Sequence, residues 1–257
     1  MNYWKRATIW LTRHTVYILK TQRKWYGPVQ SRQTGIYTCR ASWMQGGSQT
    51  ASLMHQLVEV YGLQSYGISV LVGGTALVWK PLRVPSKKKA EACQMAVWDE
   101  ALGDGSRMYA FDLQTAGREQ SDGTYEWLLG AYPYDLVMGM LDALERHGCL
   151  VERIDVVPAA AGRLCPGGNG TLYVYVRQDE IHEIGLRQGI PFAYRVASQL
   201  PADAVQWLQQ EGLAPEDTLL WLDASASCWM TAPVCEAAQQ EQRQWEIPGP
   251  AVLLTTL

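Results

Sequence analysis

The sequence predicts an α/β protein whose two halves begin alike. Each half opens with three short runs of β-branched and aromatic residues separated by turn residues, a pattern typical of an antiparallel three-strand meander. The second meander starts directly after the glycine cluster at 167–170, the clearest boundary in the chain. Helical and strand-like segments follow both meanders, so the two halves predict an approximate duplication of architecture.

The strands of the first half are recognised from alternating or continuously apolar runs that end at glycine, proline or polar turn residues. They are predicted at 7–12, 15–20, 35–39, 68–72, 76–84, 108–113, 125–131 and 150–157. The first two runs are close enough to form a hairpin around Arg13 and His14.

The helices of the first half are recognised from apolar residues that recur every three or four positions, and they are predicted at 48–61, 87–102, 133–146 and 158–165. The apolar face of the first helix is formed by Leu53, Leu57, Val60 and Tyr61. Gly62 ends this helix, and Ser86 can cap the second one. The apolar face of the second helix is formed by Ala90, Cys93, Val97 and Ala101.

The second half repeats the meander with shorter elements after it. Strands are predicted at 171–176, 180–187, 190–195, 219–222 and 244–247. Helices are predicted at 203–210 and 234–242.

Composition excludes several classes of function. The 257 residues are 47 % hydrophobic and 18 % charged, as expected of a folded protein of one or two domains. A net charge of -3 gives no basic field of the kind that nucleic-acid binding needs. The six cysteines form no Cys-x-x-Cys pair and no histidine stands at zinc-ligand spacing, so no metal site is expected. No apolar run is long enough to span a membrane.

The aromatic composition favours a protein that binds other proteins. The chain has 11 Trp and 13 Tyr but only 2 Phe. Trp and Tyr combine a large apolar area with a polar atom, and they are enriched at protein interfaces. Drift in core composition is the alternative explanation.

Three segments in the middle of the chain carry a family resemblance. They are Arg83-Val84-Pro85 after a strand, Trp98-Asp99-Glu100 within the long predicted helix 87–102, and the crossover at 151–158. In this order of elements the chain resembles the PilM family, cytoplasmic actin-like proteins of type IV pilus assembly. That family is related to the cytoplasmic domain of GspL in type II secretion and to the division protein FtsA.

The resemblance implies an actin-like (ASKHA, RNase H-like) fold with two lobes, at 1–166 and 167–257. A strand-helix-strand-strand subdomain at about 67–150 would be inserted in the first lobe. The second lobe would be reduced, as in GspL, because few residues separate Arg195 from Pro201.

The resemblance also implies where a nucleotide would bind, and there the sequence departs from the family. The family pattern has Asp-x-Gly in each first hairpin, where backbone amides hold phosphates and the aspartate positions a metal ion. Here the two turns read Leu11-Thr12-Arg13-His14-Thr15 and Val176-Arg177-Gln178-Asp179-Glu180. The adenine-side glycine pair is replaced by 222–227. We therefore expect no cofactor, no metal and no catalytic residue.

A nucleophilic catalytic site built from other residues is an alternative. It would combine Asp223, Ser225 and Cys228 with His182. No nucleophile-elbow pattern and no spacing argument joins these residues, so turn residues on a surface loop are the favoured interpretation.

The function that the resemblance implies is that of a non-catalytic adaptor of a type IV pilus or type II secretion platform. It would be cytoplasmic and peripherally associated with the inner membrane. It would link a membrane-anchored partner, through a PilN-like N-terminal peptide, to the assembly or secretion ATPase, without binding nucleic acid. An actin-like ATPase, a filament subunit and a homodimer stay open.

The resemblance implies a partner-binding groove between the core of the first lobe and its inserted subdomain. Its predicted residues are Arg83, Trp98 and Asp99. Trp and Arg are common binding hot spots, because each combines contact area with directed hydrogen bonds. The alternative for Trp98 is a core position in its helix.

Overall fold

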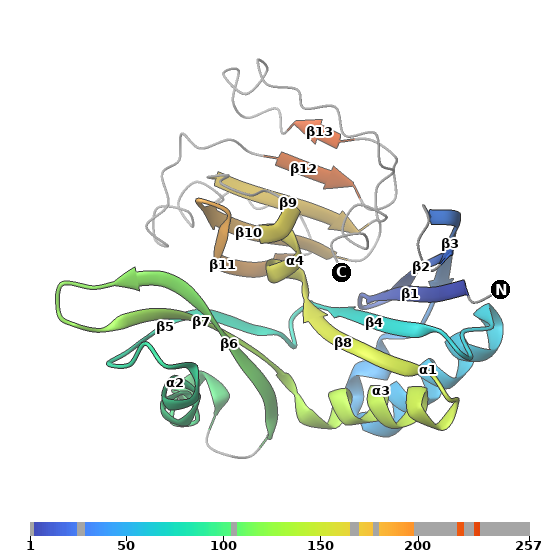
Figure 1. The fold of residues 1–257 in the computed structure, drawn as a ribbon, viewed down its shortest axis with the longest axis horizontal. Coiled ribbons are helices and arrows are strands. Elements are labelled where there is room, and N and C mark those ends of the chain that lie inside the picture. The colour runs from blue at the N-terminus through green and yellow to red at the C-terminus, as the bar shows by residue number, and fades with distance from the viewer. Residues whose placement is uncertain are drawn as a thin grey trace.

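The computed structural model describes residues 3–24, 29–103, 107–164, 170–176, 180–197, 220–223 and 229–231. These residues form two five-stranded sheets and one three-stranded sheet, with helices packed beside them (Figure 1).

The first sheet has the strand order β3-β2-β1-β4-β8. Its antiparallel meander consists of β1 (Tyr3–Leu11), β2 (Thr15–Lys24) and β3 (Val29–Thr38). The parallel part adds β4 (Gly67–Val72) beside β1 and then β8 (Leu150–Val156). The predicted hairpin around Arg13 and His14 is confirmed, and β3 begins earlier than predicted.

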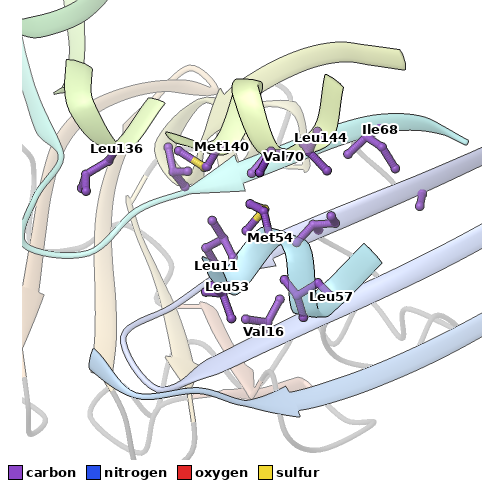
Figure 2. Close-up of a cluster of buried hydrophobic side chains, with 14 of the residues drawn as sticks. Leu11, Val16, Leu53, Met54, Leu57, Ile68, Val70, Leu136, Met140 and Leu144 are labelled. Carbon is purple, nitrogen blue, oxygen red and sulfur yellow. The ribbon is translucent and has the colours of Figure 1, made fainter. Parts of the chain in front are cut away.

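Two helices cover one face of this sheet. A 3₁₀ turn, η1 (Ala41–Gln45), leads into α1 (Gly47–Tyr61), and α3 (Tyr134–Arg146) packs beside α1. Figure 2 shows the apolar side chains of the helices packed over those of the sheet. Apolar residues recur every three to four positions in the helices and every two positions in the strands, so each element buries one face. The labelled core residues are Leu11, Val16, Leu53, Met54, Leu57, Ile68, Val70, Leu136, Met140 and Leu144.

The predicted end of α1 is confirmed, but part of its predicted face is wrong. Gly62 adopts φ 59°, the left-handed conformation that glycine tolerates best at a helix C-terminus. Val60 is exposed, whereas Met54 and Val58 are buried beside Leu57. The buried face of α1 is therefore rotated relative to the predicted one, because the helix packs its Met54 side against α3 as well as against the sheet.

The three-stranded sheet is antiparallel, in the order β5-β7-β6. Its strands are β5 (Val78–Val84), β6 (Tyr109–Glu119) and β7 (Tyr125–Pro133). Between β5 and β6 lie α2 (Lys89–Ala96) and the 3₁₀ turn η2 (Glu100–Leu102). A separate small core joins α2 to this sheet, and Figure 1 shows the unit at one end of the molecule.

The predicted bounds of this insertion, 67–150, are too wide. β4 is the fourth strand of the first sheet, hydrogen-bonded to β1 on one side and β8 on the other, and α3 packs on α1. The sheet that is added to the lobe spans only β5 to β7. A strand flanked on both sides by parallel partners belongs to the central sheet, whatever its neighbours in sequence are.

The predicted helix 87–102 is also shorter than expected. Trp98 N–H donates to Met95 O and Asp99 N–H donates to Ala96 O, so the chain tightens and leaves the helix after Ala96. The buried face consists of Ala92 and Ala96, whereas Val97 is exposed. Ser86 does act at the helix start, since its Oγ accepts the Lys88 N–H at 3.1 Å.

The second sheet has the order β11-β10-β9-β12-β13. After α4 (Val157–Leu164), the predicted meander is confirmed as β9 (Gly170–Val176), β10 (Glu180–Arg187) and β11 (Ile190–Ala197). β12 (Leu220–Asp223) lies parallel to β9, and β13 (Trp229–Thr231), which was not predicted, pairs with β12.

Several predictions for the second half fall outside the described residues: the helices 203–210 and 234–242 and the strand 244–247. The division into domains 1–166 and 167–257 stays a prediction. Of the helices in the described part of the chain, none has both the length and the apolar character to cross a membrane.

Candidate functional site

An exposed apolar turn follows α2 on the surface of the insertion. Trp98 is 88 % exposed, and Met95 and Val97 beside it are 41 % and 55 % exposed. The alternative that Trp98 is a core residue is therefore wrong. We call residues 95–99 the Trp98 turn. Large apolar side chains grouped on a surface are typical of a binding site for another protein.

Asp99 fixes the Trp98 turn to the sheet below it. Its carboxylate accepts the Ala101 N–H at 2.8 Å, which caps η2, and it pairs with the Lys80 ammonium at 3.0 Å. The Asp99 side chain is only 10 % exposed. Asp99 therefore positions the turn from beneath, and little of its carboxylate is left for a partner to contact.

Arg83 lies on the opposite face of the inserted sheet from the Trp98 turn. Alternate residues of a strand point to opposite faces. Leu82 and Val84 pack in the core beneath α2, and Lys80 reaches Asp99 on the same side. Arg83 must point the other way, where it is exposed opposite Glu126 of β7. The structure thus brings Trp98 and Asp99 together and separates them from Arg83.

Lys80 is the residue of this site that sequence reasoning missed. A lysine in the middle of the apolar run 76–84 was a usable signal, because a charged residue half-buried in a strand needs a partner. The identity of the partner could not be read from sequence, since Asp99 belongs to a turn whose position depends on where α2 ends.

Apart from the Trp98 turn, the surface has a cavity at the edge of the first sheet. A cavity of about 390 Å³ opens between the end of β3, η1 and α1, and Arg40 and Trp43 are among its lining residues. None of the predicted residues Arg83, Trp98 and Asp99 lines it.

The first hairpin turn is held together by hydrogen bonds of its own backbone and side chains. Thr12 N–H donates to Thr15 O at 2.9 Å, and Thr15 N–H donates to Thr12 Oγ1 at 3.1 Å. Trp43 Nε1 donates to the carbonyl oxygens of Thr12 and Arg13, both at 3.2 Å. The amides of Thr12 and Thr15 therefore close the hairpin through bonds within the turn. The turns at 177–179 and 224–227 lie outside the described residues.

Side chains of the second sheet contact the loop after β4 and Trp10 of β1. The loop after β4 contacts β11, because Gly74 N–H donates to Tyr194 Oη at 2.8 Å, and Tyr194 Oη lies 2.7 Å from His182 Nδ1. His182 is fully buried, with its ring centroid 5.9 Å from that of Trp10 on β1. A Cβ at Gly73 would lie 2.8 Å from Val157. The two sheets are thus in direct side-chain contact here.

Buried ionisable groups surround this junction. Glu180 Oε1 lies 3.2 Å from His182 Nε2, although the two atoms are not aligned for a hydrogen bond. Burial, with the Glu180 charge nearby, raises the pKa of Tyr132 and of Tyr194, so both hydroxyls stay protonated. In the described part of the chain, no three His, Cys, Asp or Glu side chains come together as a metal site.

This architecture is that of the actin-like proteins: a meander extended by a parallel strand beside its first strand, used twice, with an insertion in the first unit. The comparison with solved structures confirms that fold. A chain of the PilM-PilN type IV pilus biogenesis complex is similar with a TM-score of 0.57 and 15 % identity, over 82 % of this chain and 66 % of that one. The cytoplasmic domain of EpsL, an inner membrane component of the type II secretion system of Vibrio cholerae, is similar with a TM-score of 0.60 and 15 % identity. That match covers 98 % of this chain and 93 % of the EpsL domain.

A third structure, from Bacteroides thetaiotaomicron, has an actin-like ATPase fold and unknown function, and matches with a TM-score of 0.53 and 12 % identity. It covers 91 % of this chain and 85 % of that one. No family sequence model matches the chain, and no curated protein matches it in sequence. The predicted resemblance to PilM and GspL is thus confirmed at the level of the fold.

Proposed function

We propose that this chain is a non-catalytic adaptor of a type IV pilus or type II secretion inner-membrane platform. It would work on the cytoplasmic side of the membrane, where it would link a membrane-anchored partner to the assembly or secretion ATPase. The observation that carries this proposal is the match to the EpsL cytoplasmic domain over nearly the whole length of both chains.

The first hairpin turn supports the non-catalytic part of the proposal. An ATPase needs backbone amides that face the phosphates and a carboxylate that holds the metal ion. Here the Thr12 and Thr15 amides are hydrogen-bonded within the turn, and residues 11–15 contain neither the aspartate nor the glycine of the family pattern.

We expect calorimetric titration with Mg-ATP to give no binding heat, and a phosphate-release assay to show no turnover. Both results follow from the absence of the Asp-x-Gly pattern in residues 11–15, which leaves no carboxylate in this turn to hold a metal ion. A protein known to bind Mg-ATP serves as the positive control for both measurements. Micromolar binding accompanied by turnover would contradict the adaptor and favour an actin-like ATPase.

The Trp98 turn supports the partner-binding part. A side chain that is 88 % exposed contributes little to folding, yet Trp is among the residues most enriched at binding hot spots. We propose that a PilN-like N-terminal peptide packs against Trp98, while Asp99 and Lys80 hold the turn in place.

Trp98→Ala should weaken binding of the membrane partner's N-terminal peptide by about 1–3 kcal/mol. The thermal midpoint should change little, because the side chain is solvated in the free protein. Titration calorimetry with the synthetic peptide measures the first effect, and a thermal melt measures the second.

Arg83→Ala is the matched control, because Arg83 is exposed on the other face of the same sheet. It should bind the peptide normally. Normal binding by Trp98→Ala would remove the turn from the site. A loss with Arg83→Ala alone would move the site to the opposite face.

A further inference from the structure

The positive charge of this chain is concentrated in its N-terminal meander. Residues 1–58 contain no Asp or Glu, so all 25 acidic residues come later in the sequence. The same segment holds eight basic residues: Lys5, Arg6, Arg13, Lys20, Arg23, Lys24, Arg32 and Arg40. An acidic protein with one strongly basic segment has a defined electrostatic polarity.

Part of this charge gathers around a tryptophan at the outer end of the β1–β2 hairpin. Arg6 Cζ lies 4.0 Å and Arg23 Cζ 4.6 Å from the centre of the Trp4 ring. Trp4 and Arg23 are direct cross-strand partners, so the register of the hairpin builds this contact. Trp4 is 39 % exposed, which leaves part of the ring accessible from solvent.

The other face of the same hairpin carries basic groups as well. Lys5 Nζ lies 5.6 Å and Lys20 Nζ 6.0 Å from the centre of the Tyr66 ring. Lys20 lies further along the hairpin, opposite Ala7, and its Nζ donates to Tyr61 O at 3.0 Å. Arg6, which stacks on Trp4, also pairs with Glu152 at 3.0 Å. We call Trp4, Lys5, Arg6 and Arg23 the basic hairpin end.

We propose that the basic hairpin end docks directly on an anionic phospholipid surface. Phospholipid head groups attract clustered Lys and Arg, and Trp is favoured at the boundary between water and acyl chains. A plane of charge can contact basic groups that project from both faces of a hairpin. An acidic peptide would instead need a groove, and neither of the two cavities beside β3 is lined by Trp4, Lys5, Arg6 or Arg23. Of the basic residues near Tyr66, Lys20 lines one of these cavities.

Lipid docking by the basic hairpin end is compatible with the proposed adaptor function but does not depend on it. Figure 1 shows the N-terminus and the start of β1 at the opposite end of the molecule from the inserted sheet and α2. A chain lying on a membrane through the basic hairpin end would therefore keep the Trp98 turn away from the lipid.

The test is co-sedimentation of the purified full chain with vesicles of phosphatidylcholine, with or without phosphatidylglycerol. We expect binding only with phosphatidylglycerol. The binding should disappear between about 0.15 and 1 M salt, as the Debye length falls from about 8 to 3 Å. Equal binding to both vesicles, or no binding to either, would overturn the proposal.

The variant Lys5→Gln/Arg23→Gln should weaken vesicle binding by about tenfold or more, since each basic residue near an anionic surface contributes about fivefold. Trp4→Ala should also weaken it, and circular dichroism melts check that both variants fold. Arg40→Gln is the matched control, because Arg40 belongs to the same acid-free segment but lies beyond β3.

An equal loss with Arg40→Gln would overturn the assignment to this site, because only overall charge would then matter. Tighter binding to poly-glutamate than to vesicles would also overturn it, in favour of an acidic protein partner. Trp98→Ala should bind vesicles normally, so failure here and failure of the adaptor proposal can be told apart.

Discussion

Single side chains connect parts of this molecule that are far apart in sequence, and Tyr194 is the clearest case. Its hydroxyl accepts the Gly74 N–H across 120 positions and lies within hydrogen-bond distance of His182 on the neighbouring strand. A buried backbone N–H without an acceptor is costly. Tyr194 therefore holds the loop after β4 against the second sheet.

Removing this hydroxyl should destabilise the protein. Tyr194→Phe keeps the ring but leaves the Gly74 amide without its acceptor, which costs about 1–3 kcal/mol of unfolding free energy. Urea denaturation measures the change. Tyr134→Phe is the matched control, because Tyr134 is 41 % exposed and its substitution should change stability by about 0.5 kcal/mol or less. Equal effects of the two substitutions would show that the Gly74 contact contributes nothing.

At the scale of elements, the pairing of α1 with α3 depends on two glycines. A Cβ at Gly139 would lie 2.3 Å from Gly47 O, and a Cβ at Gly47 would lie 2.5 Å from Asp135 O. Both clashes are with backbone, which cannot rotate away as a side chain can. The start of α1 and the middle of α3 therefore approach as closely as they do only because both positions lack a side chain.

Gly139→Ala tests this close approach. Alanine is favoured over glycine within a helix by about 1 kcal/mol. Overpacking against rigid backbone costs about 1–3 kcal/mol, so the net effect should be a loss of stability. A thermal melt measures it, with the exposed Asp142→Ala in the same helix as control. A Gly139→Ala protein more stable than the wild type would show that the helices can separate at no cost.

At the scale of the whole molecule, the contact between the two sheets is lined by buried hydroxyls as well as by apolar groups. Trp79 of the insertion donates its Nε1 proton to Pro191 O of β11 at 2.8 Å, so three sheets meet close to this junction. Tyr132 is buried and Tyr194 half-buried there, and desolvation raises the pKa of both hydroxyls. The junction should therefore respond to alkaline pH.

The direction of this response follows from proton linkage. In the unfolded chain these tyrosines lose their protons near the ordinary pKa of 10.0, whereas in the folded chain they keep them to higher pH. Their contribution to the free energy of unfolding is thus fully present below pH 10.0 and is lost as the pH rises above it. Above pH 10.0, each tyrosine should lower the free energy of unfolding by about 1.4 kcal/mol per pH unit.

Urea denaturation as a function of pH measures this loss, and the double variant Tyr132→Phe/Tyr194→Phe should reduce its slope above pH 10.0. The comparison is between slopes, so the lower starting stability of the variant does not matter. An unchanged slope would show that other groups control alkaline unfolding.

The sequence by itself determined the local elements and the fold class. Periods of two and of three to four located the meanders and the long helices, and Gly62 marked a helix end, because these signals depend on neighbours along the chain. The concentration of basic residues before position 59 was also present in the sequence, although its grouping around Trp4 required the register of β1 with β2.

Only the tertiary structure decided which residues share a surface. Arg83 and Trp98 both looked like parts of one groove, but the face of β5 that α2 covers puts them on opposite sides. The same holds for the Lys80–Asp99 pair, the Gly139–Gly47 approach and the bond from Gly74 to Tyr194. Such contacts depend on strand register and on where each helix ends. Both are set by packing between segments far apart in the chain, which no local pattern encodes.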